Sequence, residues 1–235
     1  MTRVARGDAG KGRVVLLVAL AVLIAVGVGA WWFVLRDDAE PVATLGDCQV
    51  ADGPAPTTAT GTWTVAPGGD SGSFVGYRMQ ERFGGATVEK TATGRTGEVE
   101  GSMVVTDDAV TTGMFVAHLD SLHSNRTARD TAIHTKGLET DTFPTATFTL
   151  TKPIALDSVA PGEPVHATAT GTLELHGQTQ TVDVPIDACW TGPAIKLSGS
   201  APIVLSDYGI QQIHTPIVDI ADHGDLELHL VLTPS

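Results

Sequence analysis

The sequence predicts an all-β domain, either a sandwich or a barrel, preceded by one long uncharged segment. Three observations lead to this prediction. Short apolar runs alternate with polar residues along most of the chain after residue 61, as in antiparallel strands with one wet face. The links between these runs are of hairpin length. Residues 14–35 carry no charge, and such a run is long enough to cross a bilayer core of about 30 Å.

The composition is that of an acidic chain. It has 235 residues, with 14 Lys and Arg against 27 Asp and Glu, and a formal net charge of -13 at pH 7. A protein that binds a phosphate backbone needs a basic face. The charge therefore argues against nucleic acid as a partner. No pattern in the sequence indicates an oligomeric state.

The N-terminal segments indicate a membrane anchor. Residues 1–13 are polar and basic, and acidic residues follow soon after the uncharged run at 14–35. This asymmetry predicts a single-pass transmembrane helix in the cell membrane, with a cytoplasmic N-terminus and an extracytoplasmic C-terminal domain. The competing interpretation is a cleaved signal peptide, whose apolar core is about 7 to 15 residues long and ends at small residues. The uncharged segment at 14–35 is longer than this, and it has Trp31 and Trp32 near its end in place of small residues. The uncleaved anchor is therefore favoured.

The remaining chain divides into a linker and one domain. Residues 36–61 are rich in Asp, Pro, Thr, Ala and Gly and have no apolar periodicity, which predicts a flexible linker. The domain is expected over residues 62–235, with a polar turn region at 84–97. Alternating apolar residues predict strands that begin at 62 and 73, and further strands over 99–105, 109–119, 145–152, 167–176, 182–187, 195–205 and 226–232.

The longest polar insert in the domain covers residues 121–148. It contains a cap-like Asn125, followed by a segment that predicts a helix of about three turns. A long polar insert between strands of a small β domain is usually a lid or a plug. The insert is therefore expected to cover one end of the domain.

Several motifs occur in a fixed order along the domain. They are TWTV at 62–65, SFVGYRMQE at 73–81 with GRTGEVEG at 94–101, SLHSNRTARD at 121–130, TFPTATFTLT at 142–151, ATGTLELHGQTQTVDVPI at 169–186 and SDYGI at 206–210. Together they resemble the YceI-like family of polyisoprenoid-binding, lipocalin-like bacterial proteins, over about residues 62–233. The resemblance implies an eight-stranded antiparallel lipocalin-like barrel with an apolar lumen and a short helical insert. The apparent anchor and the longer, more polar hairpin after Tyr77 depart from the commonest family pattern.

An apolar lumen of this kind is expected to hold an isoprenoid, quinone or fatty-acyl lipid, because burying a prenyl tail gains about 0.8 kcal/mol per CH₂. The alternative is that the same side chains fill the core and leave no cavity, as in many small barrels. Residues expected to face the lumen are Val75, Tyr77, Met79, Met103, Val116, Phe148, Leu173, Leu175, Val184, Ile203 and Leu228.

Two pairs of polar residues have both a functional and a structural interpretation. Arg126 and Arg129 in the insert are candidates for the rim of the lumen, where an arginine could meet a lipid headgroup. The alternative is a structural clamp between Arg129 and Asp130. Cys48 and Cys189 are expected to form a disulfide if the domain is exported, and otherwise to be two unpaired thiols.

The sequence shows no motif for catalysis or for metal binding. His118, His123 and His134 have no compact ligand spacing, and no nucleophile motif or phosphate-cradling glycine loop is present. We therefore expect no cofactor, no metal and no enzymatic activity. The favoured hypothesis is a membrane-anchored extracytoplasmic lipid-binding protein. The alternative is a cell-surface interaction or stress-protection module with a filled core; a metal- or haem-assisted redox enzyme is a third hypothesis.

Overall fold

The computed structural model describes residues 17–29, 39–50, 57–66, 71–83, 88–156, 159–215 and 218–235. The chain forms two compact units, Met1–Asp37 and Asp38–Ser235. In the first unit, the described residues form a helix over 17–29. The second unit contains the β domain predicted from the sequence.

The predicted membrane topology is contradicted. Of the predicted span over 14–35, residues 14–16 and 30–35 lie outside the described residues. Among the residues that are described, no helix is both long enough and apolar enough to cross a membrane. A helix rises about 1.5 Å per residue and needs about 20 apolar residues for this purpose, and the described helical residues, 17–29, are fewer. The single-pass topology was inferred from the length of the uncharged run at 14–35, of which the structure describes only this part.

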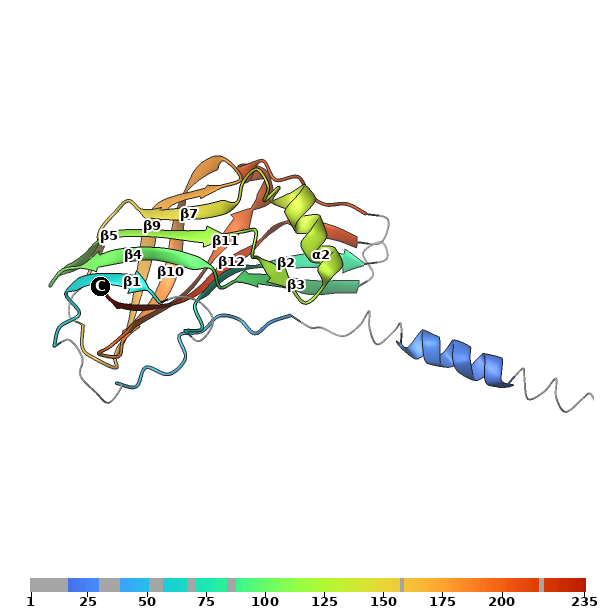
Figure 1. The fold of residues 1–235 in the computed structure, drawn as a ribbon, viewed down its shortest axis with the longest axis horizontal. Helices are drawn as coiled ribbons and strands as arrows, with labels where there is room; N and C mark the ends of the chain where they lie inside the picture. Colours follow the sequence, from blue (N-terminus) through green and yellow to red (C-terminus); the bar gives the residue numbers. More distant parts are fainter. Residues whose placement is uncertain are drawn as a thin grey trace, which may run out of the picture. The chain divides into compact units, whose positions relative to one another are not determined.

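The β domain is a closed antiparallel barrel of eight strands (Figure 1), as predicted. The first and last strands, β1 and β12, pair with each other and close the ring. In ring order the strands are β1 (Gly61–Val65), β4 (Val99–Val105), β5 (Ala109–His118), β7 (Thr145–Leu150), β9 (Pro164–Leu175), β10 (Gln178–Trp190), β11 (Ile195–Val204) and β12 (Val218–Pro234).

Three additional strands extend the sheet from β12, and one small strand pairs with β5. The extension runs from β12 to β2 (Phe74–Phe83), β3 (Val88–Thr96) and β6 (His123–Ser124), and β8 (Ile154–Ala155) pairs with β5. The prediction of a polar turn region over 84–97 is therefore wrong for residues 88–96. β3 was not predicted, because its buried positions include polar side chains such as Lys90 and Thr96.

The insert contains a helical segment of about the predicted length. It contains β6, then α2 (Thr127–Ala132) and a π-helical turn over Ile133–Gly137. Arg126, and not Asn125, occupies the N-cap position of α2, without a side-chain cap. α2 lies at one end of the barrel, beside β2 and β3 in Figure 1. Ile133, just after α2, is buried in a cluster with Leu122 and Leu175, which holds the insert against the barrel.

A two-residue turn joins β9 to β10. His176 and Gly177 have φ angles of 51° and 71°, and the flanking residues Leu175 and Gln178 are paired across the hairpin. Two consecutive residues with positive φ are typical of hairpin turns whose twist matches that of the strands. The ring of His176 also packs on Phe143, with ring centroids 4.4 Å apart, so the turn is fixed to the end of the insert.

Residues 39–50, which the sequence assigns to the linker, lie against the outer face of the barrel. The backbone N–H of Glu40 donates to Thr93 Oγ1 (3.0 Å) on β3, and the N–H of Ala43 donates to Glu227 Oε2 (3.3 Å) on β12. Arg95 binds the same glutamate through Nε (2.9 Å) and Nη2 (2.8 Å). Arg78 Nη1 lies 3.6 Å from Glu227 Oε2, and the Glu227 side chain is fully buried. We call Glu227, Arg95 and Arg78 the outer clamp, because they hold residues 39–50 against the sheet.

Candidate functional site

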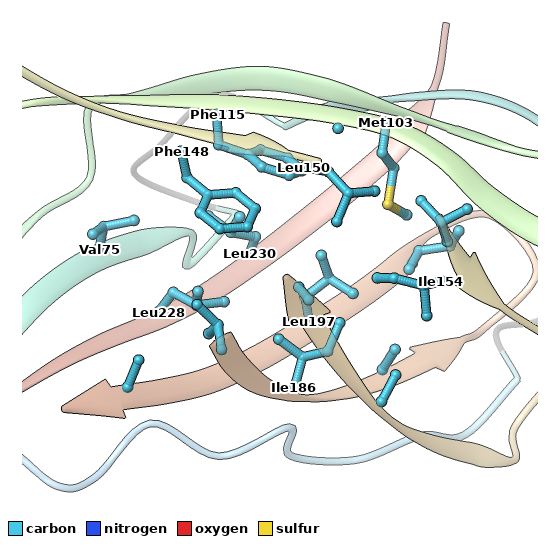
Figure 2. Close-up of a pocket in the computed structure, with 18 of the residues that line it drawn as sticks. Val75, Met103, Phe115, Phe148, Leu150, Ile154, Ile186, Leu197, Leu228 and Leu230 are labelled. Atoms are coloured by element: carbon cyan, nitrogen blue, oxygen red, sulfur yellow. The ribbon is translucent and has the colours of Figure 1, made fainter. Parts of the chain in front are cut away.

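The interior of the barrel contains an apolar cavity of about 190 Å³, enough for about a dozen water molecules. Inward-facing side chains from most strands of the ring line it. Figure 2 shows Phe115, Phe148 and Leu150 opposite Ile186, Leu197 and Leu228 across this space. We call it cavity 1. The lumen is therefore not filled by its own side chains.

A second apolar cavity, cavity 2, has a volume of about 140 Å³. It is lined by β2, by the insert and by the segment after β11. The two cavities adjoin, because they share five lining residues: Val75, Ala146, Leu173, Ile203 and Leu226. The barrel thus offers two adjacent apolar cavities, with these side chains in the wall of both.

All but one of the predicted lumen residues line these cavities. Cavity 1 is lined by Val75, Met103, Phe148, Leu173, Val184, Ile203 and Leu228. Cavity 2 is lined by Val75, Tyr77, Met79, Leu173, Leu175 and Ile203. Whether these side chains contact a ligand stays a prediction.

Val116 does not line either cavity. Its neighbours Phe115 and Ala117 line cavity 1, and successive side chains of a strand point to opposite faces. Val116 therefore lies on the outer face, with Met114, whose side chain is 52% exposed. The prediction was wrong by one residue because β5 has large apolar side chains on both faces, so its alternation did not distinguish inside from outside.

Several large residues that line cavity 1 were not among the predicted lumen residues. Trp190, Leu197 and Leu230 line cavity 1 and are buried. Leu197 and Leu230 were detectable, since each follows the alternation of its predicted strand. Trp190 was not, because it lies beyond the predicted end of its strand at residue 187.

A buried ion pair lies in the wall of cavity 2. Arg129 on α2 donates from Nε to Glu81 Oε1 (2.7 Å) and from Nη2 to Glu81 Oε2 (2.9 Å). Its Nη1 donates to Asn125 Oδ1 (2.9 Å). The two charged side chains are only 7% and 5% exposed. We call this pair the inner clamp, because it ties α2 to the inward face of β2.

The predicted structural alternative for Arg129 was a pair with Asp130, and the structure gives it a different partner. Asp130 instead accepts from the backbone N–H (2.8 Å) and the Oγ–H (2.6 Å) of Ser124. Arg126 lines neither cavity, and its N–H donates to Ser124 Oγ (3.2 Å). Headgroup contact by either arginine therefore stays a prediction, and for Arg129 it would have to occur beside the carboxylate of Glu81.

Tyr77 contributes a second polar group to cavity 2. Its hydroxyl oxygen is buried and has no hydrogen-bond partner among the described residues. Burial raises the pKa of Tyr77, and the nearby negative charges of Glu81 and Asp130 raise it further, against an opposing effect of Arg129. The hydroxyl is therefore neutral at physiological pH and keeps its proton. An unsatisfied buried hydroxyl costs about 1–3 kcal/mol, and no pattern in the sequence indicated it.

The structure does not assemble the histidines into a metal site. His118 Nε2 lies 3.5 Å from Glu100 Oε1, His123 Nδ1 lies 3.1 Å from the Ser121 carbonyl, and His134 Nε2 contacts the Leu122 carbonyl at 2.7 Å. Within the described part of the chain, no group of three or more His, Cys, Asp and Glu residues is placed to hold a metal ion.

Cys48 and Cys189 lie together. Their Cα atoms are 5.9 Å apart, within the usual range for a disulfide. Cys48 belongs to the segment on the outer face, and Cys189 lies near the end of β10. A bond at this position joins residues 39–50 to the sheet at a second point, beyond the outer clamp. The pairing itself stays a prediction.

Comparison with solved structures finds the same fold. A polyisoprenoid binding domain from Saccharophagus degradans, implicated in plant cell wall breakdown, is 16% identical, with a TM-score of 0.55 over 75% of this chain and 99% of that one. BcnA of Burkholderia cenocepacia is 19% identical, with a TM-score of 0.50 over 66% and 95%. No curated protein matches significantly. The family model for the YceI-like domain matches residues 63–232, which contain the whole ring except the outermost residues of β1 and β12. The chain therefore belongs to the YceI-like family.

Proposed function

We propose that this protein binds an isoprenoid or a similar amphiphile in the lumen of its barrel. The observation that carries the proposal is the pair of adjoining apolar cavities. Apolar side chains line almost all of it, so a prenyl or acyl chain placed there would leave water at a gain of about 0.8 kcal/mol per CH₂. The name of the structural relative from Saccharophagus degradans agrees with this ligand class.

Leu173 is the best position at which to test the proposal, because it lines both cavities and is 8% exposed. Leu173→Glu places a carboxylate in the wall that the two cavities share, where burying an unpaired charge is strongly unfavourable. We expect the variant to bind a prenylated benzoquinone at least about tenfold more weakly than the wild type. Isothermal titration calorimetry with the full chain measures the loss.

Met114→Glu is the matched control, since it introduces the same charge on the outer face of the neighbouring part of the barrel. It should bind the quinone as the wild type does. Circular dichroism must show that both variants keep the β spectrum of the wild type. Unchanged affinity in folded Leu173→Glu would contradict binding in the lumen. Failure of the wild type to bind would favour the module without a ligand.

A further inference from the structure

The further inference concerns the polar groups of cavity 2 and rests on the proposed function. Along β2, the side chains of Val75, Tyr77, Met79 and Glu81 all line this cavity. Its wall thus changes from purely apolar to partly polar within one strand. Such a wall is matched to a ligand that has an apolar chain and one polar end, because mostly apolar pockets use a few placed polar groups to fix orientation.

The charged groups in this wall are already neutralised. Both carboxylate oxygens of Glu81 accept from Arg129, and the third nitrogen of that guanidinium donates to Asn125. Lys90 is buried and stands opposite Glu81 in the β2–β3 ladder, and the acidic Asp130 is close enough to Tyr77 to affect its ionisation. The positive charges of Arg129 and Lys90 therefore balance the negative charges of Glu81 and Asp130. A phosphate or carboxylate headgroup would add an unbalanced negative charge beside Glu81, at a high cost in a buried site.

Tyr77 supplies a buried polar atom of this wall that has no hydrogen-bond partner among the described residues. Its hydroxyl is buried, and the absence of a Cβ at Gly94 makes room for its ring, since a Cβ there would lie 2.4 Å from Tyr77 Cε1. A buried donor without an acceptor is unfavourable in the empty protein. A ligand oxygen that accepts from it would remove that penalty.

We propose that cavity 2 is the headgroup site and that Tyr77 selects an amphiphile whose polar end is an uncharged carbonyl, such as a quinone or an ester. The Tyr77 hydroxyl donates to the carbonyl oxygen, and the chain continues past Leu173 into cavity 1. The inner clamp holds the wall in place and offers an anionic headgroup no unpaired positive charge.

The test measures binding to the full-length protein by calorimetry. It uses four probes with the same prenyl tail: three end in a benzoquinone, an acetate ester or a monophosphate, and the fourth is the hydrocarbon without a headgroup. The wild type should bind the carbonyl probes about three- to tenfold more tightly than the hydrocarbon, the expected effect of one net hydrogen bond. The phosphate probe should bind more weakly than either carbonyl probe. A preference between quinone and ester identifies which of the two headgroups the site accepts.

Tyr77→Phe removes only the hydroxyl oxygen and should abolish the preference for carbonyl probes while leaving hydrocarbon affinity unchanged. Its unfolding midpoint in urea should be equal to or above that of the wild type, because an unsatisfied group is lost. A preserved carbonyl preference in Tyr77→Phe, or tighter binding of the phosphate probe by the wild type, would overturn the headgroup inference and leave lumen binding intact. Binding of no probe by the wild type would overturn both.

Discussion

Two buried glutamates of this barrel make similar ion pairs in different surroundings. Glu81 in the inner clamp is 4% exposed and Glu227 in the outer clamp is 1% exposed, and each is bound by an arginine at two nitrogens. The inner clamp joins α2 to a strand wall that also lines cavity 2. The outer clamp joins residues 39–50 to the opposite face of the sheet.

The difference lies in what surrounds each carboxylate. Glu227 also lies 3.6 Å from Arg78 and accepts from the N–H of Ala43, so several donors share its charge. Both carboxylate oxygens of Glu81 accept from one guanidinium beside an apolar cavity, with the buried Lys90 opposite Glu81 in the β2–β3 ladder. Removing Arg129 should therefore lower the free energy of unfolding more than removing Arg95 does. Only the loss of Arg129 should weaken ligand binding.

Arg129→Met tests the inner clamp and should have the larger effect. The substitution keeps an apolar side chain of similar length but leaves the Glu81 carboxylate buried without its bidentate partner. Breaking a buried pair in this way costs about 3–5 kcal/mol. We expect a loss of this size in the free energy of unfolding, measured by urea denaturation, together with weaker binding of the benzoquinone probe.

The double variant Glu81→Gln/Arg129→Met serves as the control, because it removes both charges. It should recover most of the lost stability, since the main cost in the single variant is the uncompensated carboxylate. If the double variant is no more stable than Arg129→Met, the loss comes from packing of the arginine side chain, and the ion pair is not the cause.

Arg95→Met tests the outer clamp and should have the smaller effect, about 1–3 kcal/mol, because Arg78 and Ala43 remain beside Glu227. The substitution also removes the guanidinium 4.0 Å above the Phe74 ring. Urea denaturation and calorimetry should show lower stability with unchanged affinity for the benzoquinone. A drop in affinity comparable to that of Arg129→Met would show that the two clamps are not separable.

The fold was predictable where one face of a strand is consistently apolar. β12 shows this best, because Leu226, Leu228, Leu230 and Leu232 alternate with polar or outward residues over its second half. Its first half was missed because Ile220 is the only residue before Leu226 in β12 that lines a cavity, and β3 was missed because its inward positions include polar or charged side chains such as Lys90 and Thr96. Of the uncharged run at 14–35, the structure describes residues 17–29, and no helix among the described residues is long and apolar enough to cross a membrane.

The lining of the lumen was predictable by the same alternation. The prediction failed at Val116, because β5 has large apolar side chains on both faces. The polar part of the site was not predictable. Arg129 was expected beside Asp130 because the two are neighbours in sequence, whereas its partner Glu81 lies 48 residues away. Long-range pairing of this kind depends on closure of the barrel. The same is true of the unpaired hydroxyl of Tyr77, whose surroundings come from β2, β3 and the insert.

The most direct test of the central claim is to identify what the protein carries when it is isolated. The full chain is purified without detergent, weighed by native mass spectrometry and then extracted with organic solvent. The account predicts a stoichiometric apolar adduct whose extracted component has a prenyl or acyl chain and an uncharged polar end. A clean mass of the protein alone, with no uptake of an added prenylated benzoquinone, would contradict it.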